Sequence, residues 1–170
     1  IWNGGDAKIG VVSVGKSYLD TILALDELGI EEQDAIRLGL RLYKVTMPWP
    51  LEDNGIIEFA KGLDLIIVVE EKRAIIELQI KEILYETSSN PTVIGKTDEN
   101  GNSLFSSVGA LDSNLIASTI GDRILKFQHD EVLSARVKEM ELRLDSLSLP
   151  EESIQRMPYF CSGCPHNSST

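Results

Sequence analysis

The sequence predicts an α/β domain in which a parallel or mostly parallel sheet is covered by helices on both faces. Segments rich in β-branched residues alternate with segments that have a helical apolar period, which is typical of chains that build such a sheet. The segment 63–69 is nearly all apolar, as expected for a strand that is buried on both faces.

The first elements follow from local residue signals. The strand expected over 8–14 ends at Gly15, and Ser17 is the expected N-cap of the next helix. The buried face of that helix is expected to contain Leu19, Ile22, Leu23 and Leu25. The following elements are a helix over 31–38 that Gly39 ends, a strand over 41–47, a helix over 54–60, the buried strand over 63–69, a helix over 74–85 and a strand over 91–95. Two prolines make 47–50 a turn.

The second half is expected to be helical after a polar loop over 96–107. A helix over 111–127 carries apolar residues on one face, namely Leu115, Ile116, Ile120, Ile124 and Phe127. In a second helix over 130–147, apolar residues recur at steps of four and three and form a narrow seam: Leu133, Val137, Met140, Leu144 and Leu147. This seam needs a partner, which is either the chain's own 111–127 helix or another domain or subunit. We therefore expect an α/β domain over 1–128, a helical extension over 129–149 and a tail over 150–170.

Charge and composition exclude several classes of protein. The net charge is −11, and Lys and Arg do not cluster, which argues against nucleic acid and against anionic membrane surfaces. No apolar run approaches the roughly 18 residues of a membrane span. The two cysteines both lie near the C-terminus and do not form a secreted disulfide framework. We expect a cytoplasmic protein and, because the chain does not begin with Met, a piece of a longer one.

The segment Gly10-Val-Val-Ser-Val-Gly15-Lys16-Ser17 matches the P-loop pattern. In a P-loop the strand precedes the first glycine and the four intervening residues form a phosphate-binding loop. Here those four residues are typical of a strand, so the segment indicates a strand-to-helix turn. A second interpretation stays open, in which helix N-terminal amides together with Lys16 and Ser17 hold an anion.

The tail motif Cys161-Ser-Gly-Cys164-Pro-His166 has spacing that allows two thiolates to bind one metal ion or cluster. A tetrahedral zinc site needs four ligands, and the chain adds only His166 and the distant His129. Cys-Pro also occurs around iron–sulfur clusters. The spacing alone leaves two interpretations, half of a metal or cluster site or unliganded thiols.

Two further segments follow predicted strands, where α/β domains bind ligands. Glu70-Glu71-Lys72-Arg73 follows the buried strand, and its carboxylates are either an acid or base or the cap of the next helix. Trp49 lies after another strand, in a packed turn or at a site or interface. No catalytic residue is assigned, because the two histidines do not assemble a triad.

Several stretches in this order resemble the central part of the large bacterial indolepyruvate:ferredoxin oxidoreductases. They are Gly15-Lys-Ser-Tyr-Leu-Asp20, Arg41-Leu-Tyr-Lys-Val45, Met47-Pro-Trp-Pro50, Val69-Glu-Glu-Lys-Arg73 and Pro158-Tyr-Phe-Cys-Ser-Gly-Cys-Pro-His-Asn167. The resemblance covers nearly the whole chain, is weakest over 97–157 and is most specific in the last motif.

The resemblance implies a fold and a parent enzyme. The fold is the three-layer α/β/α sandwich of the transketolase C-terminal domain, with about five strands and an antiparallel first strand that residues 1–3 partly supply. The parent would use thiamine diphosphate and Mg²⁺ to decarboxylate an aryl 2-oxoacid, form the acyl-coenzyme A and pass electrons through [4Fe-4S] clusters to ferredoxin. In relatives a similar motif supplies cluster ligands, which Cys161 and Cys164 match, although Pro165 stands where those relatives have glycine.

The chain lacks the Gly-Asp-Gly motif that would hold magnesium diphosphate and the four-cysteine set of a ferredoxin. The cofactor chemistry is therefore expected outside these residues. We expect a structural domain that contacts other domains or subunits of the parent enzyme and binds no cofactor itself. The alternatives are an anion- or nucleotide-binding module that uses residues 15–17 and a metal-binding domain that uses Cys161 and Cys164.

Overall fold

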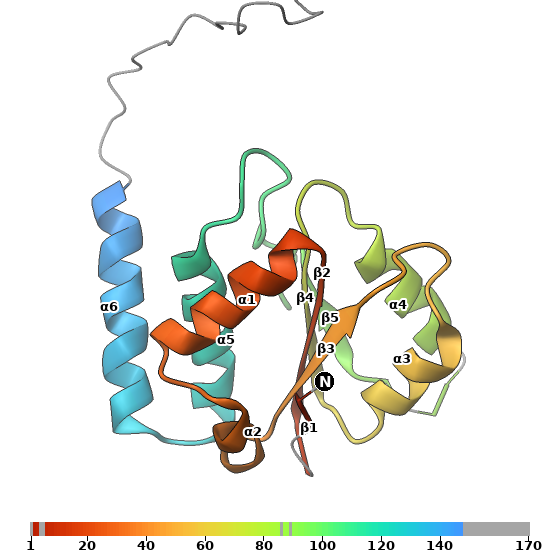
Figure 1. Ribbon diagram of the computed structural model, residues 1–170, viewed down its shortest axis with the longest axis horizontal. Coiled ribbons are helices and arrows are strands. Elements are labelled where there is room, and N and C mark those ends of the chain that lie inside the picture. The colour runs from red at the N-terminus through yellow and green to blue at the C-terminus, as the bar shows by residue number, and fades with distance from the viewer. Residues whose placement is uncertain (1, 4–5, 86, 89, 148–170) are drawn as a thin grey trace, which may run out of the picture.

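The computed structural model describes residues 2–3, 6–85, 87–88 and 90–147, which form a sheet flanked by helices (Figure 1). The strands are β1 (Trp2–Asn3), β2 (Ile9–Val14), β3 (Leu40–Val45), β4 (Leu65–Val69) and β5 (Thr92–Ile94). The helices are α1 (Lys16–Glu27), α2 (Glu32–Leu38), α3 (Asp53–Ala60), α4 (Ile76–Leu84), α5 (Ser113–Phe127) and α6 (Glu131–Leu147). Each described element of the predicted order is present, and the ends differ by a few residues.

The sheet has five strands in the order β1-β3-β2-β4-β5. Strands β3, β2, β4 and β5 are parallel, and β1 pairs antiparallel with β3 through Trp2 and Leu42. In the centre of the sheet, Val11 of β2 lies between Leu42 and Ile67. The structure confirms the predicted mostly parallel sheet and the antiparallel first strand.

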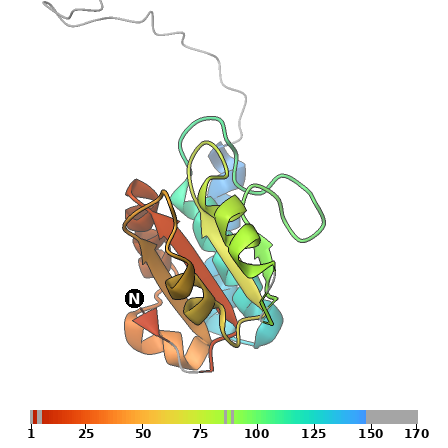
Figure 2. The same ribbon diagram turned by 90° about the vertical axis from the view of Figure 1, so that its right-hand side faces the viewer.

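Two apolar cores lie on opposite faces of the sheet, as the alternation of strand side chains requires. Ile67 of β4 faces the core beneath α1, α5 and α6, whereas Ile66 and Val68 face the core beneath α3 and α4. All five residues of β4 are buried. Figures 1 and 2 show these helices as separate layers on either side of the sheet, so the predicted three-layer arrangement is confirmed.

Helix α1 buries only part of the face predicted for it, since Leu25 is buried and Ile22 packs against the core as expected. Leu19 is 66% exposed and Leu23 is 48% exposed, whereas Ser17 and Thr21 are buried. The helix begins at Lys16 with Gly15 as its N-cap, so the expected capping role of Ser17 is wrong. Gly15 has a φ of +55° and a ψ of −126°, a conformation that glycine adopts most readily.

The seam of α6 packs against its own domain. Leu133, Val137 and Met140 are buried in the core that α5 supplies, and Leu144 is half-buried. The contact with α5 is close, because a Cβ atom built on Gly121 would lie 2.3 Å from Val137 Cγ2. Of the two partners that the sequence left open for this seam, the chain's own α5 is the one observed. The side chain of Leu147 lies outside the described residues, and the division at residue 128 stays a prediction.

Polar contacts also hold both ends of α6. Asp130 accepts a hydrogen bond from the Leu133 amide at 3.0 Å and pairs with Arg37 at 2.8 Å. These two contacts, the amide bond first, lower the pKa of the Asp130 carboxyl below its usual value. Arg136 donates to the Glu27 carbonyl at 3.1 Å, and Arg143 pairs with the Glu27 carboxylate at 3.2 Å. The helix is therefore an integral part of the folded unit.

Gly10, the first glycine of the P-loop pattern, lies inside β2 and has a packing role. A Cβ atom at this position would lie 2.6 Å from Leu63 Cδ1 and 2.7 Å from Phe59 Cζ, both of which are buried. Residues 11–14 lie in β2, which confirms the prediction that they form a strand. The segment is therefore a strand and not a phosphate-binding loop.

Gly10→Ala is expected to lower the free energy of unfolding by about 1–3 kcal/mol, because the added methyl overpacks the contact between β2 and α3. Urea denaturation followed by circular dichroism measures this change. Gly62→Ala is a comparison at a glycine with open space but a φ of +77°, where only backbone strain is expected, of about 1 kcal/mol. A Gly10→Ala protein as stable as the wild type would contradict the packing role.

Within the described residues, no helix combines the length and the apolar character needed to cross a bilayer. The tail over 150–170, with Cys161, Cys164 and His166, lies outside the described residues.

Candidate functional site

The candidate residues after β2, β3, β4 and β5 meet at one edge of the sheet. Lys16 follows β2, Trp49 follows β3, Glu70 and Glu71 follow β4, and Lys96 follows β5. The carboxyl ends of parallel strands share an edge, and ligands of open α/β sheets bind there. This edge is the candidate site.

The strand order places the expected ligand crevice between β2 and β4. The chain runs outward from β2 to β3 and then crosses to β4, and the reversal leaves a crevice beyond the two strand ends. Here Lys16 Nζ lies 2.7 Å from an Asp20 oxygen and 3.5 Å from a Glu71 oxygen. The bond to Asp20 raises the pKa of Lys16, with a smaller contribution from Glu71. The cation that an anion would need already has two carboxylate partners from its own chain.

Ser17 does not present its hydroxyl group to this crevice from a cap position. It is buried in the first turn of α1, and its carbonyl accepts a hydrogen bond from the Thr21 hydroxyl at 2.7 Å. The geometry gives no support to an anion site built from Lys16 and Ser17, which stays a prediction of the sequence.

Glu70 caps α4. The side chain is 3% exposed and accepts hydrogen bonds from the amides of Ile75 at 3.0 Å, Ile76 at 2.9 Å and Glu77 at 3.1 Å. These amides have no partner within the helix, and the carboxylate also complements the positive end of the helix dipole. Of the two roles that the sequence left open for Glu70, helix capping is the one observed.

A second buried carboxylate, Glu77, joins α4 to the end of β5. It accepts a hydrogen bond from the Lys96 amide at 2.8 Å and pairs with Lys81 at 2.6 Å. The Lys96 ammonium donates to the Glu70 carbonyl, and burial lowers its pKa although Glu70 and Glu77 oppose the effect. Sequence reasoning did not single out Glu77 or Lys96, because their role depends on the fold.

An apolar groove lies beside these buried polar groups, on the side of the sheet that α4 covers. Its volume is about 680 Å³. The walls come from the turn after β3, the loop before α4, the outer face of α4 and the loop after β5, and the lining residues are Trp49, Arg73, Ala74, Ile75, Leu78, Gln79, Glu82, Lys96 and Ser107. The groove is therefore a feature of the same sheet edge.

Gln79 holds the Trp49 turn against α4. Its side-chain amide donates to the Pro48 carbonyl at 2.9 Å and accepts from the Leu51 amide at 2.9 Å. The Gln79 side chain is 8% exposed, and its hydrogen bond to the Leu51 amide is buried.

Gln79→Leu should raise the hydrogen-exchange rate of the Leu51 amide and lower the free energy of unfolding by about 1–3 kcal/mol, because it leaves the buried Leu51 amide without its acceptor. Hydrogen exchange with mass spectrometry measures the first effect and urea denaturation the second. Leu78→Gln, one residue away on the exposed face of α4, is the matched control and should change neither. An unchanged Leu51 exchange rate in Gln79→Leu would contradict this role.

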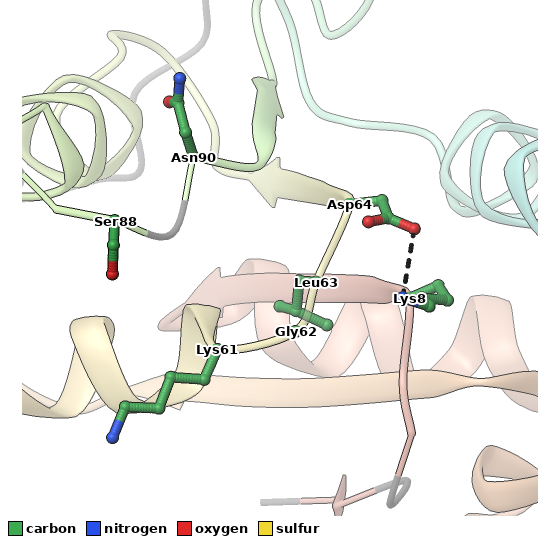
Figure 3. Close-up of a pocket in the computed structure, with 7 residues that line it drawn as sticks. All are labelled: Lys8, Lys61, Gly62, Leu63, Asp64, Ser88 and Asn90. Carbon is green, nitrogen blue, oxygen red and sulfur yellow. Dashed lines mark ion pairs between the residues drawn. The ribbon is translucent and has the colours of Figure 1, made fainter.

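The opposite edge of the sheet has a polar hollow of about 550 Å³ (Figure 3). Lys8 and Asp64, which precede β2 and β4, form an ion pair there at 3.6 Å. The other cation, Lys61, points away from them in Figure 3 and pairs with Glu58. Because both lysines have acidic partners, this hollow offers no uncompensated charge to a ligand.

The described residues do not fit the diphosphate and metal of thiamine diphosphate. Within those ranges, no three His, Cys, Asp or Glu side chains gather closely enough to hold a metal ion. At the sheet edge, the Glu70 carboxylate occupies the amides of α4 that would otherwise face an anion. No catalytic step through that cofactor is derived from these residues, and whether Cys161 and Cys164 bind a cluster stays a prediction.

The fold and this edge define an α/β domain in which Lys16, beside the expected ligand crevice, pairs with carboxylates of its own chain and Glu70 caps the next helix. The chain belongs to the indolepyruvate oxidoreductase domain family, whose family model matches residues 1–146. This match confirms the resemblance stated above.

The relatives share the name indolepyruvate oxidoreductase subunit IorA. The protein from Pyrococcus horikoshii is 26% identical over 96% of this chain, and the one from Methanothermobacter thermautotrophicus is 26% identical over 98%. The chain spans 22% and 23% of the length of these two relatives. Both are archaeal, so the bacterial origin expected from the sequence stays a prediction.

A solved structure named split gene transketolase, inactive beta4 tetramer, is also similar to this chain. Its TM-score is 0.46 with 16% sequence identity, and the match covers 72% of this chain and 39% of that one.

Proposed function

We propose that this chain is a structural domain of an indolepyruvate oxidoreductase, that it contacts other domains or subunits beside the thiamine diphosphate site, and that it holds no cofactor in its described part. The family membership supports the enzyme class. The single observation that carries the structural role is that the charged groups beside the expected crevice already have partners in this chain, because Lys16 pairs with Asp20 and Glu71 while Glu70 caps α4.

Under this proposal the parent enzyme supplies the chemistry. Thiamine diphosphate with Mg²⁺ would serve decarboxylation, [4Fe-4S] clusters would carry electrons to ferredoxin, and coenzyme A would be the acyl acceptor, all in the cytoplasm. Cys161 and Cys164 would contribute to a cluster only together with ligands from outside this chain, because a cluster needs about four thiolates.

Calorimetric titration of the 170-residue chain tests the proposal. Thiamine diphosphate with Mg²⁺, coenzyme A and ATP should each give no saturable heat, and the chain should not oxidise indolepyruvate with a viologen acceptor, whereas the full-length parent protein should. Turnover by the chain alone would overturn the structural role. Saturable ATP binding that disappears in Lys16→Ala would instead establish the nucleotide-binding alternative.

A further inference from the structure

We propose that the apolar groove over α4 is the docking face for another domain of the same parent polypeptide, which presents an apolar side chain next to a carboxylate. The inference deepens the proposed function and rests on it. It assigns the interdomain contact to one face of this domain and states which kinds of side chain the covering segment presents.

The walls of the groove expose large apolar side chains. Trp49 is 72% exposed, Leu78 is 63% exposed and Ile75 is 51% exposed, although they line one continuous groove. Single exposed apolar residues are ordinary, but a contiguous group marks a contact surface. Trp and Arg are also the residues that most often contribute strongly to binding, and Arg73 lies on this lining.

The groove is held in shape before any partner arrives. Gln79 fixes the Trp49 turn through two backbone hydrogen bonds, and Glu70 fixes the Ile75 amide at the start of α4. Lys72 adopts a φ of +59° and donates to the Gly109 carbonyl at 3.1 Å, which ties the loop before α4 to the loop after β5. A preorganised surface binds at a lower entropic cost, so these contacts suit a docking face.

The charges at the groove indicate an acidic partner. Among the described residues, Arg73 forms no ion pair, although the chain as a whole has a net charge of −11. Lys96 also lines the groove, but its ammonium already donates to the Glu70 carbonyl, and Glu82 contributes a carboxylate on α4. An uncompensated guanidinium beside apolar walls fits a carboxylate that lies next to an apolar side chain.

The covering segment is assigned to the parent polypeptide because of its length. The chain spans 22% of the Pyrococcus horikoshii relative, so more than three quarters of such a polypeptide is available to pack around this domain. Interfaces between domains of one chain resemble protein–protein interfaces in size and composition, and they place aromatic side chains and Arg at their centres.

Hydroxyl-radical footprinting of the full-length parent protein tests the assignment. Each labelling rate is divided by the rate in the denatured protein. Leu78 and Leu142 are a matched pair, with 63% and 68% exposure, and Leu142 lies on α6. We expect Trp49 and Leu78 to be labelled roughly tenfold more slowly than Leu142, as for side chains at the centre of an interface.

The same measurement separates the two proposals. If Leu78 is labelled as fast as Leu142 while Leu19 on α1 is protected, the docking face is wrong and the structural role stands. If none of these residues is protected in the full-length protein, both proposals are overturned.

The proposed carboxylate of the partner domain is tested in the full-length protein with Arg73→Lys, which introduces an amine that a carbodiimide can couple to a neighbouring carboxylate. We expect a zero-length cross-link from residue 73 to an Asp or Glu outside residues 1–170.

Footprinting of charge variants is the second test. We expect Arg73→Glu to raise the labelling rate of Leu78 about threefold or more, as for a repulsive charge in a docked face, and Arg73→Lys to leave that rate unchanged. Cross-links confined to this chain, or protection that survives Arg73→Glu, would overturn the acidic partner.

Discussion

Val137→Asp is expected to lower the free energy of unfolding of this chain by about 3–5 kcal/mol, because it buries a carboxylate without a partner. Val137 is 3% exposed. The space around it is filled on the α5 side, where a Cβ atom on Gly121 would lie 2.3 Å from Val137 Cγ2. The carboxylate has no room for a hydration shell unless α6 separates from α5. Urea denaturation at neutral pH, followed by circular dichroism, measures the change.

Val132→Asp is the matched control on the same helix. Val132 is 68% exposed, so the same substitution should change the free energy of unfolding by no more than about 0.5 kcal/mol. Equal effects of the two substitutions would show that α6 does not pack through the seam. A Val137→Asp protein that keeps its stability but self-associates less would instead assign the seam to a contact between chains.

The sequence predicted the sheet and its two-sided cover because these follow from local patterns. Residues 65–69 are apolar without interruption, and four of the five are β-branched, which favours a strand buried on both faces. The period of the α6 seam likewise identified the buried residues Leu133, Val137 and Met140. The seam did not identify its partner, because a helix of alternating three- and four-residue spacing packs equally well on any apolar helix.

The buried face of α1 was predicted only in part, since Leu25 is buried as expected whereas Leu19 and Leu23 are exposed. Leu19 and Leu23 are the more hydrophobic residues, yet Ser17 and Thr21 are buried. A short side chain allows close approach of α1 to the core. The Thr21 hydroxyl donates a hydrogen bond to the Ser17 carbonyl, so it has a partner although it is buried. The spacing of apolar residues alone does not reveal that a polar side chain can be buried when it has a hydrogen-bond partner within its own helix.

The sequence predicted which edge of the sheet carries the candidate residues, but it did not predict the contacts between them. The rule that ligands bind at the carboxyl ends of parallel strands brought Lys16, Trp49, Glu70 and Glu71 to one edge. The pairing of Lys16 with Glu71 depends on the strand order, which no local pattern encodes. The burial of Phe105 was also not predicted. This residue is 1% exposed although it lies in the polar segment expected to be an exposed loop.

Glu70→Ala is expected to lower the free energy of unfolding by about 2–4 kcal/mol, because it leaves the buried Ile76 and Glu77 amides without an acceptor. Glu70 accepts from three amides of the α4 N-terminus, at 2.9 Å to 3.1 Å, and its side chain is 3% exposed. Glu70→Gln keeps one oxygen for the Ile75 and Ile76 amides but loses the negative charge at the positive end of the helix. It should have an effect between those of Glu70→Ala and the wild type.

Glu52→Ala is the comparison that isolates the effect of burial. Glu52 also caps a helix, α3, and accepts from the Asn54 and Gly55 amides, but it is exposed to solvent. Water replaces a lost acceptor at an exposed cap, so we expect about 1 kcal/mol for this substitution. Urea denaturation of the three variants gives the ranking, and hydrogen exchange of the Ile76 amide localises the effect to the start of α4. If Glu70→Ala costs no more than Glu52→Ala, the Glu70 carboxylate is not a structural cap, and its position at the edge of the sheet would have to be explained by an acid or base role instead.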